Sequence, residues 1–405
     1  MNAPFAHPVT PSVAALAAGI EALIPEIEAA GPRSDETTHL DNSIVEKLRA
    51  AGLYSLLLPR ELGGAELSHV EAMRLGERIA WAHGSTGWCV VVNNSLATMM
   101  ALFISDAGAR TIFGARPDVT VSGNGVPRGY ARPVEGGFMI KGKWAYGSGI
   151  EHAEWIHSGC FLTDEAGAMV MLPNGQPRML ICHHPRATIE LKGNWDVLGL
   201  RGTGSYDYGL KDVEEFFVPR DLCYFFEDSA PLRGSLQGSI GLVGYTAWGH
   251  TTFILGVTRR MMDELVKLAQ VRVDAIGKMG DSQTLRLEFA RAEAKYRSAR
   301  AFVYETWQSI ADSYAAGERA SLHQLTMVKL ALRHAHDVAS DVATFCHRAA
   351  RGASLHKGVL QTCYRDIHAA TQHILMADEM VAECGRVLLG GAKPDAEWTV
   401  FGVDG

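Results

Sequence analysis

The chain has 405 residues, which is long enough for two or three domains with sizeable cores. It is 47% hydrophobic and 20% charged, as in an ordinary globular protein, and its formal net charge of −7 argues against nucleic-acid or anionic-membrane partners. We find no uninterrupted apolar run of membrane-spanning length and no secretory signal pattern. The seven cysteines are scattered without a C-x-x-C pair. We therefore expect a cytoplasmic protein without a disulfide framework or a metal site.

Residues 1–115 are expected to form an N-terminal helical domain. Ser43-Ile44-Val45-Glu46 and Ser68-His69-Val70-Glu71 have the pattern of capping boxes, in which the first and last side chains cap the helix start reciprocally. The helices that they open can end at Gly52 and Gly84.

The apolar run from Trp88 to Ile104 is interrupted by Asn93, Asn94 and Ser95. Buried polar groups must find partners or cost about a few kcal/mol each in desolvation. Two interpretations stay open: these side chains bond a neighbouring element, or they face a ligand.

Residues 116–226 are expected to form a compact antiparallel β domain, a sandwich or a barrel. Glycines and prolines recur between short β-rich runs. Gly136-Gly137 predicts a turn, after which Phe138, Ile140, Gly142 and Trp144 share one face of a strand. The strand then ends in Tyr146-Gly147-Ser148-Gly149, where glycines let the backbone approach a flat ring closely or simply loosen the strand end.

Residues 227–405 are expected to form a C-terminal helical bundle. Four helices of about twenty residues or more fit between 236 and 390. Asp281 is a candidate cap for one of them, and Ser321-Leu322-His323-Gln324 is a capping box that opens another.

Helices, a β domain and a helical bundle, in that order, resemble the acyl-CoA dehydrogenase superfamily. Four motifs carry the resemblance, and they lie in the family's order along the chain. The resemblance implies an α+β fold, mostly α, that assembles as a homotetramer. The motifs are Trp144-Ala145-Tyr146-Gly147-Ser148-Gly149, the run from Trp195 to Ser205, Phe217-Val218-Pro219 and Arg365-Asp366.

The catalytic glutamate of the family's dehydrogenases is missing from both of its usual places. One reads Gln372-His373-Ile374, and the other lies between Asp228 and Asp263, where the chain has no Asp or Glu. Without a carboxylate base, proton abstraction from an acyl thioester loses its main agent. A glycine-rich stretch that grips flavin in dehydrogenases is also replaced by the run from His347 to Gly352.

The run from Arg365 to His373 instead resembles two-component flavin-dependent monooxygenases of the same fold. This resemblance implies an oxygenase that takes reduced FMN or FAD from a separate NAD(P)H-flavin reductase. It would react the flavin with O₂ through a C4a-hydroperoxide and hydroxylate an aromatic or heteroaromatic small molecule. No Gly-x-Gly-x-x-Gly nicotinamide motif opens a βαβ unit, which agrees with a separate reductase. An acyl-CoA dehydrogenase, an N-hydroxylase forming nitroso products and a flavin-free binding protein remain as alternatives.

The resemblance assigns site residues in three groups. Ser148 would bond flavin near N5, His373 is a candidate acid–base group on the last long helix, and Arg365-Asp366 is expected to be a buried ion pair. His368 is expected to be structural. The catalytic candidates are His373, Ser148, Asn94 and Ser95. The candidates for the cofactor are Trp144, Tyr146, Gly147, Ser148, Gly149, Ser122 and Arg272. Those for the substrate are Asn93, Trp88, Trp195 and His373.

Overall fold

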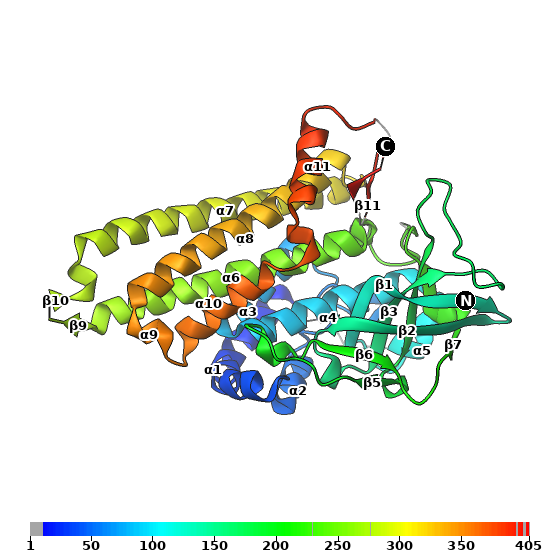
Figure 1. Cartoon of the computed structure of the whole chain (residues 1–405), viewed down its shortest axis with the longest axis horizontal. Helices are drawn as coiled ribbons and strands as arrows, with labels where there is room; N and C mark the ends of the chain where they lie inside the picture. Colours follow the sequence, from blue (N-terminus) through cyan, green and yellow to red (C-terminus); the bar gives the residue numbers. More distant parts are fainter. Residues whose placement is uncertain (1–10, 229, 276, 394–395, 400–401, 405) are drawn as a thin grey trace.

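The structure, a computed structural model, has its sheet at one end and a bundle of long helices that extends away from it, and the N-terminal helices pack against the bundle (Figure 1). α6, α7 and α8 run alongside one another in the bundle, and α6 also borders the N-terminal helices. The structure describes residues 11–228, 230–275, 277–393, 396–399 and 402–404.

The N-terminal part is helical, as predicted. The capping box at Ser68 is present, with both of its reciprocal hydrogen bonds. The box predicted at Ser43 is wrong, because Asp41 is the cap and accepts from the Ser43 N–H at 2.9 Å. Its helices are α1 (Val13–Thr37), α2 (Asn42–Ala50), α3 (His69–Ala82), α4 (Gly84–Phe103) and α5 (Asp106–Phe113).

Helix α4 is the one described helix that is long and apolar enough to cross a membrane by composition. It is instead a core helix, since 89% of its most apolar window is buried inside the protein. It packs against α3 and α6 and touches strand β1.

The central domain is one eight-stranded sheet in the order β5-β6-β2-β1-β3-β4-β8, with β7 also paired to β2. The predicted antiparallel domain is confirmed, with one parallel pair among the described strands of the sheet. After the β1–β2 hairpin the chain crosses over, so that β3 pairs parallel to β1, starting at Val121 and Trp155. The strands are β1 (Val121–Val134), β2 (Gly137–Gly147), β3 (Trp155–Leu162), β4 (Met179–Pro185), β5 (Ile189–Leu191), β6 (Tyr206–Leu210), β7 (Phe216–Pro219) and β8 (Cys223–Phe225).

The predicted hairpin is confirmed, with its turn one residue earlier than expected. Glu135 and Gly136 form the turn, Gly136 has φ 78°, and Gly137 already pairs with Val134. Phe138, Ile140 and Trp144 point into the core as the alternation predicts.

Three of the four predicted long bundle helices are confirmed. The fourth is broken, because the described chain ends one helix at Ala370 and starts the next at Asp378. The Ser321 box caps α8 as predicted, whereas Ser282 rather than Asp281 caps α7. The C-terminal helices are α6 (Gly241–Val271), α7 (Gln283–Ala315), α8 (Leu322–Ala350), α9 (Gly352–Leu355), α10 (Val359–Ala370) and α11 (Asp378–Leu388).

Short elements complete the described chain. They include two two-stranded ladders, β9 (Val273–Asp274) with β10 (Gly277–Lys278) and β11 (Trp398–Thr399) with β12 (Gly402–Val403). The 3₁₀ helices are η1 (Arg60–Leu62), η2 (Ile150–His152), η3 (Arg186–Thr188), η4 (Arg201–Thr203), η5 (Arg220–Leu222), η6 (Leu236–Ile240), η7 (Met279–Asp281) and η8 (Ile374–Met376).

Candidate active site

The end of strand β2 forms a tight, buried corner around Ser148. Tyr146 and Gly149 both have left-handed backbone, with φ 63° and 72°, which lifts Ser148 out of the strand. The Gly149 N–H then donates to the Thr203 carbonyl at 2.7 Å. Ser122 of β1 donates its hydroxyl to the Ser148 carbonyl at 2.8 Å. These two bonds, to η4 and to β1, hold Ser148 in place.

The Ser148 hydroxyl belongs to a chain of side-chain hydrogen bonds, which we call the hydroxyl chain. Its members are Trp88, Ser148, Ser205 and Thr203. The Trp88 Nε1–H donates to Ser148 Oγ at 2.9 Å, and Ser148 Oγ lies 2.7 Å from Ser205 Oγ. Ser205 Oγ lies 2.7 Å from Thr203 Oγ1, which donates to the Leu200 carbonyl at 2.7 Å.

The direction of the protons in the hydroxyl chain follows from its two ends. A carbonyl only accepts, so Thr203 gives its one hydroxyl proton to Leu200 and accepts from Ser205. Ser205 has then used its own proton and accepts from Ser148. Ser148 therefore gives its proton to Ser205, takes a bond from Trp88, and keeps one lone pair. Toward any further partner Ser148 Oγ is an acceptor only.

The carbonyl end of the hydroxyl chain is fixed by helix α10. Asp366 Oδ1 accepts from the Leu200 N–H at 2.6 Å, and the Trp195 Nε1–H donates to the Leu200 carbonyl at 3.1 Å. Burial, reinforced by nearby Asp35, raises the pKa of Asp366 to about 7. The predicted Arg365–Asp366 ion pair is therefore wrong. Asp366 accepts from the Leu200 backbone N–H instead, and no ion pair among the described residues joins it to Arg365.

Trp88 connects the hydroxyl chain to a group of three histidines, which we call the histidine cluster: His250, His336 and His373. The Trp88 ring meets the His250 ring edge-on, with centroids 4.6 Å apart. His250 lies on α6, His336 on α8, and His373 just before η8. The His250 centroid is 4.2 Å from that of His373 and 5.6 Å from that of His336.

All three rings of the histidine cluster are neutral near pH 7. Burial lowers the pKa of His336 to about 4 and that of His373 to about 4. It lowers the pKa of His250 well below the ordinary value, and the two neighbouring rings add to the effect. The site thus joins serine and threonine hydroxyls to uncharged imidazoles.

Several predicted site residues are brought together here. Ser148, Ser122, Trp88 and His373 all lie in or beside the two groups, and Gly147 and Gly149 form the corner. Tyr146 is 60% exposed, and its ring meets Trp195 edge-on at 6.3 Å. His373 is not on a long helix as predicted. Helix α10 ends before it, and the His373 backbone is extended.

Asn93, Asn94 and Ser95 have other partners. Asn94 bonds the Leu53 and Val90 carbonyls and the Leu56 N–H, at 2.8 to 2.9 Å. Asn93 accepts from the Val121 N–H at 2.6 Å, and Ser95 donates to the Val91 carbonyl at 2.9 Å. Their polar groups tie α4 to neighbouring backbone, so we leave all three out of the proposed site.

Trp144 and Arg272 are also placed elsewhere. Trp144 is buried in the sheet, stacks on Tyr208 at 5.5 Å and donates to the Gly159 carbonyl at 2.7 Å. Arg272 follows the end of α6, about 30 Å along the helix from His250 at 1.5 Å per residue. There it donates to the Ala350 carbonyl at 2.9 Å. His368, expected to be structural, contacts Tyr364, with ring centroids 4.4 Å apart.

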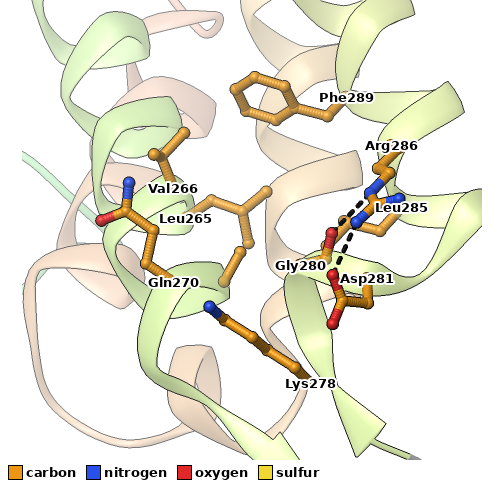
Figure 2. A pocket seen from close by; sticks show the side chains of 10 residues that line it. Leu265, Val266, Gln270, Lys278, Gly280, Asp281, Leu285, Arg286 and Phe289 are labelled. Atoms are coloured by element: carbon orange, nitrogen blue, oxygen red, sulfur yellow. Dashed lines mark hydrogen bonds and ion pairs between the residues drawn. The ribbon is translucent and has the colours of Figure 1, made fainter.

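A pocket of about 300 Å³ lies near that same end of α6, and Figure 2 shows its side chains coming from two facing helices. Its apolar wall includes Leu265 and Phe289. Its cationic Arg286 is already bound to Asp281 at 2.7 Å and to the Gly280 carbonyl at 2.8 Å. The pocket starts about 20 Å along α6 from His250, so it is separate from the candidate site.

Sequence reasoning missed four residues of the site: Thr203, Ser205, His250 and His336. Thr203 and Ser205 stand in the second family motif, but nothing in their spacing shows that their hydroxyls meet Ser148. His250 lies in an apolar run, like Asn94, and the same argument about buried polar groups could have marked it. His336 carries no comparable signal.

Comparison with known proteins identifies the family. The family described as "Acyl-CoA dehydrogenase, N-terminal domain" matches residues 20–111, and "Acyl-CoA dehydrogenase, C-terminal domain" matches residues 248–378. The solved structure of XiaF from Streptomyces sp., in complex with FADH2 and glycerol, superposes with a TM-score of 0.83. It is 20% identical, and the match covers 96% of this chain and 98% of that one.

Two curated relatives are monooxygenases. Indole-3-acetate monooxygenase of Pseudomonas putida is 29% identical over 363 residues, which cover 88% of this chain and 89% of the relative. The flavin-dependent monooxygenase oxygenase subunit HsaA of Mycobacterium tuberculosis (strain CDC 1551 / Oshkosh) is 32% identical over 207 residues, 50% of this chain and 48% of the relative.

The chain belongs to the acyl-CoA dehydrogenase superfamily, two of whose domains it carries in order. Within that superfamily it is a flavin-dependent monooxygenase rather than a dehydrogenase. His373 at the glutamate position agrees with this assignment.

Proposed function

We propose that the chain is the oxygenase component of a two-component system. It takes reduced FMN or FAD from a separate flavin reductase and hydroxylates an aromatic acid of the indole-3-acetate type. The observation that carries the proposal is the hydroxyl chain, which leaves Ser148 Oγ as an acceptor. The N5 atom of reduced flavin bears a proton, whereas that of oxidised flavin is an acceptor. Ser148 therefore fits the reduced form.

The residues present fit a bound reduced flavin. Ser148 would hold it at N5, and Tyr146 and Gly149, with their left-handed backbone, would lie along the ring edge. When bound, the flavin would activate O₂ and supply the oxygen atom that enters the substrate. In oxidised flavin N5 and Ser148 Oγ would both be acceptors, and no hydrogen bond could form between them. We therefore expect oxidised flavin to bind about 10- to 100-fold more weakly than reduced flavin.

The protein's own part is orientation, exclusion of water and proton handling. The partly exposed Trp88 ring contacts both Ser148 and His250 and so connects the two groups. The Leu375 N–H donates to His373 Nδ1 at 3.3 Å, so the neutral ring carries its proton on Nε2. That N–H can donate to substrate or product and take a proton back.

The proposal also includes a cytoplasmic location and a homotetrameric assembly. All seven cysteines are buried and unpaired, which supports a reducing, cytoplasmic compartment. Exposed apolar side chains on the C-terminal part, such as Leu355, Ile374 and Leu389, support assembly into a homotetramer.

The proposal is tested by isotope labelling. The full chain is supplied with a flavin reductase, NADH, FMN or FAD, indole-3-acetate and ¹⁸O₂, and the products are analysed by mass spectrometry. We expect one ¹⁸O atom in the organic product. Release of all the oxygen as hydrogen peroxide with every flavin and aromatic acid offered, or reduction of a dye by an acyl-CoA, would contradict the proposal.

A further inference from the structure

The histidine cluster contains polar atoms that the fold leaves without partners. His250 is 2% exposed and His336 is 1% exposed. Both ring nitrogens of His250 and the Nε2 of His336 make no hydrogen bond to any described residue. Most buried polar groups in proteins are bonded, and each exception needs a reason. A ligand group that enters the cluster would be such a reason.

The free atoms of the cluster can be assigned as donors or acceptors. His336 Nδ1 lies 2.9 Å from the Leu332 carbonyl and must donate to it, so the free Nε2 of the neutral ring is an acceptor. His373 has its proton on Nε2, which makes that atom a donor. A neutral His250 adds one donor and one acceptor. Protonation would turn each free acceptor into a donor.

The cluster has no fixed charge of its own. The charges that shift the pKa of His250 are those of His336 and His373, and the His250 ring also meets Trp88 edge-on. Within the described residues no group of three His, Cys, Asp or Glu side chains is placed to hold a metal ion. A bound anion would favour the protonated, positively charged form of a nearby imidazole, so this group of rings suits an anionic ligand.

Magnitudes support an anion. Burial shifts the pKa of His336 and His373 from 6.5 to about 4, which disfavours protonation about 300-fold. A carboxylate about 4 Å from a ring favours protonation about 1,000-fold at the effective dielectric constant of protein sites. The two effects nearly cancel, so one ring can be protonated near pH 7 when the carboxylate is present and neutral when it is absent.

We infer that His250, His336 and His373 bind the carboxylate of an aromatic acid substrate, and that binding takes up a proton from solvent. The inference deepens the proposed function and rests on it, because that function supplies an aromatic acid as the substrate. Entry would be from the side of His373 and Trp88, the partly exposed members of the two groups.

Other titratable groups lie on the elements that pack around His250, but they are engaged elsewhere. Arg333 and Asp337 of α8 act on His336 with opposite signs, and Arg333 is bound to Asp337 at 2.9 Å and Asp378 at 2.6 Å. His69 of α3 packs its ring on Trp307, His83 before α4 faces Asp35, and Asp366 of α10 bonds Leu200. Lys329 of α8 is buried with its Nζ over the Trp398 ring.

The inference is tested by calorimetry on the full chain, loaded anaerobically with reduced flavin. Indole-3-acetate and phenylacetate are titrated in phosphate and in Tris, whose protonation heats differ, with 3-methylindole and toluene as uncharged counterparts. We expect uptake that approaches one proton per bound acid between pH 5 and 6 and is about half a proton at pH 7. The affinity should weaken by up to about tenfold per pH unit up to about pH 7 and level off above it. The uncharged ligands should show neither effect. Acids that bind without proton uptake, or no tighter than their counterparts, would overturn the inference.

Variants separate the cluster from general packing. His250→Leu should weaken acid binding by about 100-fold or more, as loss of a bonded charge partner does, and change binding of the uncharged ligands little. His334→Leu, at an exposed position of the same helix as His336, is the matched control and should change neither. Equal loss for acids and uncharged ligands would overturn the inference. If a variant fails to fold, the wild-type proton uptake still decides.

The two proposals fail separately. Proton-linked acid binding without ¹⁸O incorporation would contradict the monooxygenase function and leave the carboxylate site standing. Incorporation of ¹⁸O without proton-linked binding would contradict the carboxylate site and leave the monooxygenase function standing.

Discussion

Two sets of buried polar residues lie close together in this protein and differ in one respect. Asn93, Asn94 and Ser95 on α4 bond backbone groups of neighbouring segments or of their own helix. The histidine cluster, in contact with α4 through Trp88, keeps three buried ring nitrogens without a described partner. Both sets are polar groups in apolar surroundings.

The difference teaches that burial of a polar group does not identify a site, and that several unpartnered ring nitrogens gathered in one cluster are the stronger sign. A bonded amide such as that of Asn94 stabilises the fold. An unbonded imidazole such as that of His250 destabilises it, and persists when a ligand uses it. The comparison predicts opposite consequences of mutation in the two sets.

The largest effect is expected for Asn94→Leu. It leaves the buried Leu56 N–H and Leu53 carbonyl without their side-chain partner, so the free energy of unfolding should fall by about 3–5 kcal/mol. Urea denaturation measures it, and Ser95→Ala, which removes a bond within the helix, should cost only about 1 kcal/mol. A loss of ligand binding without a loss of stability in Asn94→Leu would erase the distinction between the two sets.

The pH dependence of stability should come from the histidine side of the comparison. His336 has a pKa of about 4 in the folded protein against 6.5 when exposed, so between these values the unfolded chain binds the extra proton. Stability is therefore complete above pH 6.5 and falls as the pH drops toward 4. Relative to wild type, His336→Gln should gain up to about 3 kcal/mol over that window.

Denaturation curves at pH 4.5, 5.5 and 7 measure this gain, with the exposed His334→Gln as the control. Parallel pH profiles for wild type and His336→Gln would show that His336 is not held neutral by burial.

A smaller effect is expected in the hydroxyl chain, where every hydroxyl is bonded. Ser205→Ala removes the group that takes the Ser148 proton, so Ser148 becomes free to donate. Oxidised flavin should then bind better, and the preference for reduced flavin should fall by about tenfold, the value of one hydrogen bond. Anaerobic and aerobic titrations with FMN and FAD measure the preference. An unchanged ratio would mean that Ser148 does not meet the flavin at N5.

The smallest effect is expected for Trp88→Phe. Trp88 is the residue that connects the hydroxyl chain to the histidine cluster. The phenyl ring can still pack on His250, but Ser148 loses the donor that lies 2.9 Å away. Ser148 still accepts, so reduced-flavin affinity should change by no more than about threefold. Fluorescence titration measures it, and a loss of 100-fold would show that the Trp88 N–H itself contacts the flavin.

Local features of the fold were predictable from the sequence, and long-range ones were not. The capping boxes at Ser68 and Ser321 and the alternation of Phe138, Ile140 and Trp144 depend on neighbours within a few residues. The parallel pairing of β1 with β3 depends on a crossover that no local pattern encodes.

The site divides in the same way. Ser148 and His373 stand in motifs that a family resemblance can locate. His250 and His336 come from separate helices, and only packing brings their rings to His373. Asn94 was a catalytic candidate in the sequence. Its partners, the Leu53 carbonyl and the Leu56 N–H, lie in a distant loop that the sequence does not place beside α4.

The most direct test of the account is nitrogen NMR of the protein labelled with ¹⁵N in its histidine rings, with His250→Leu, His336→Gln and His373→Gln used to assign the signals. We predict that at pH 7 the three cluster rings are neutral in the free protein, with the His336 proton on Nδ1 and the His373 proton on Nε2. Adding indole-3-acetate should turn one of these rings into an imidazolium. Three rings that stay neutral in the saturated complex, or a ring already protonated in its absence, would contradict the account.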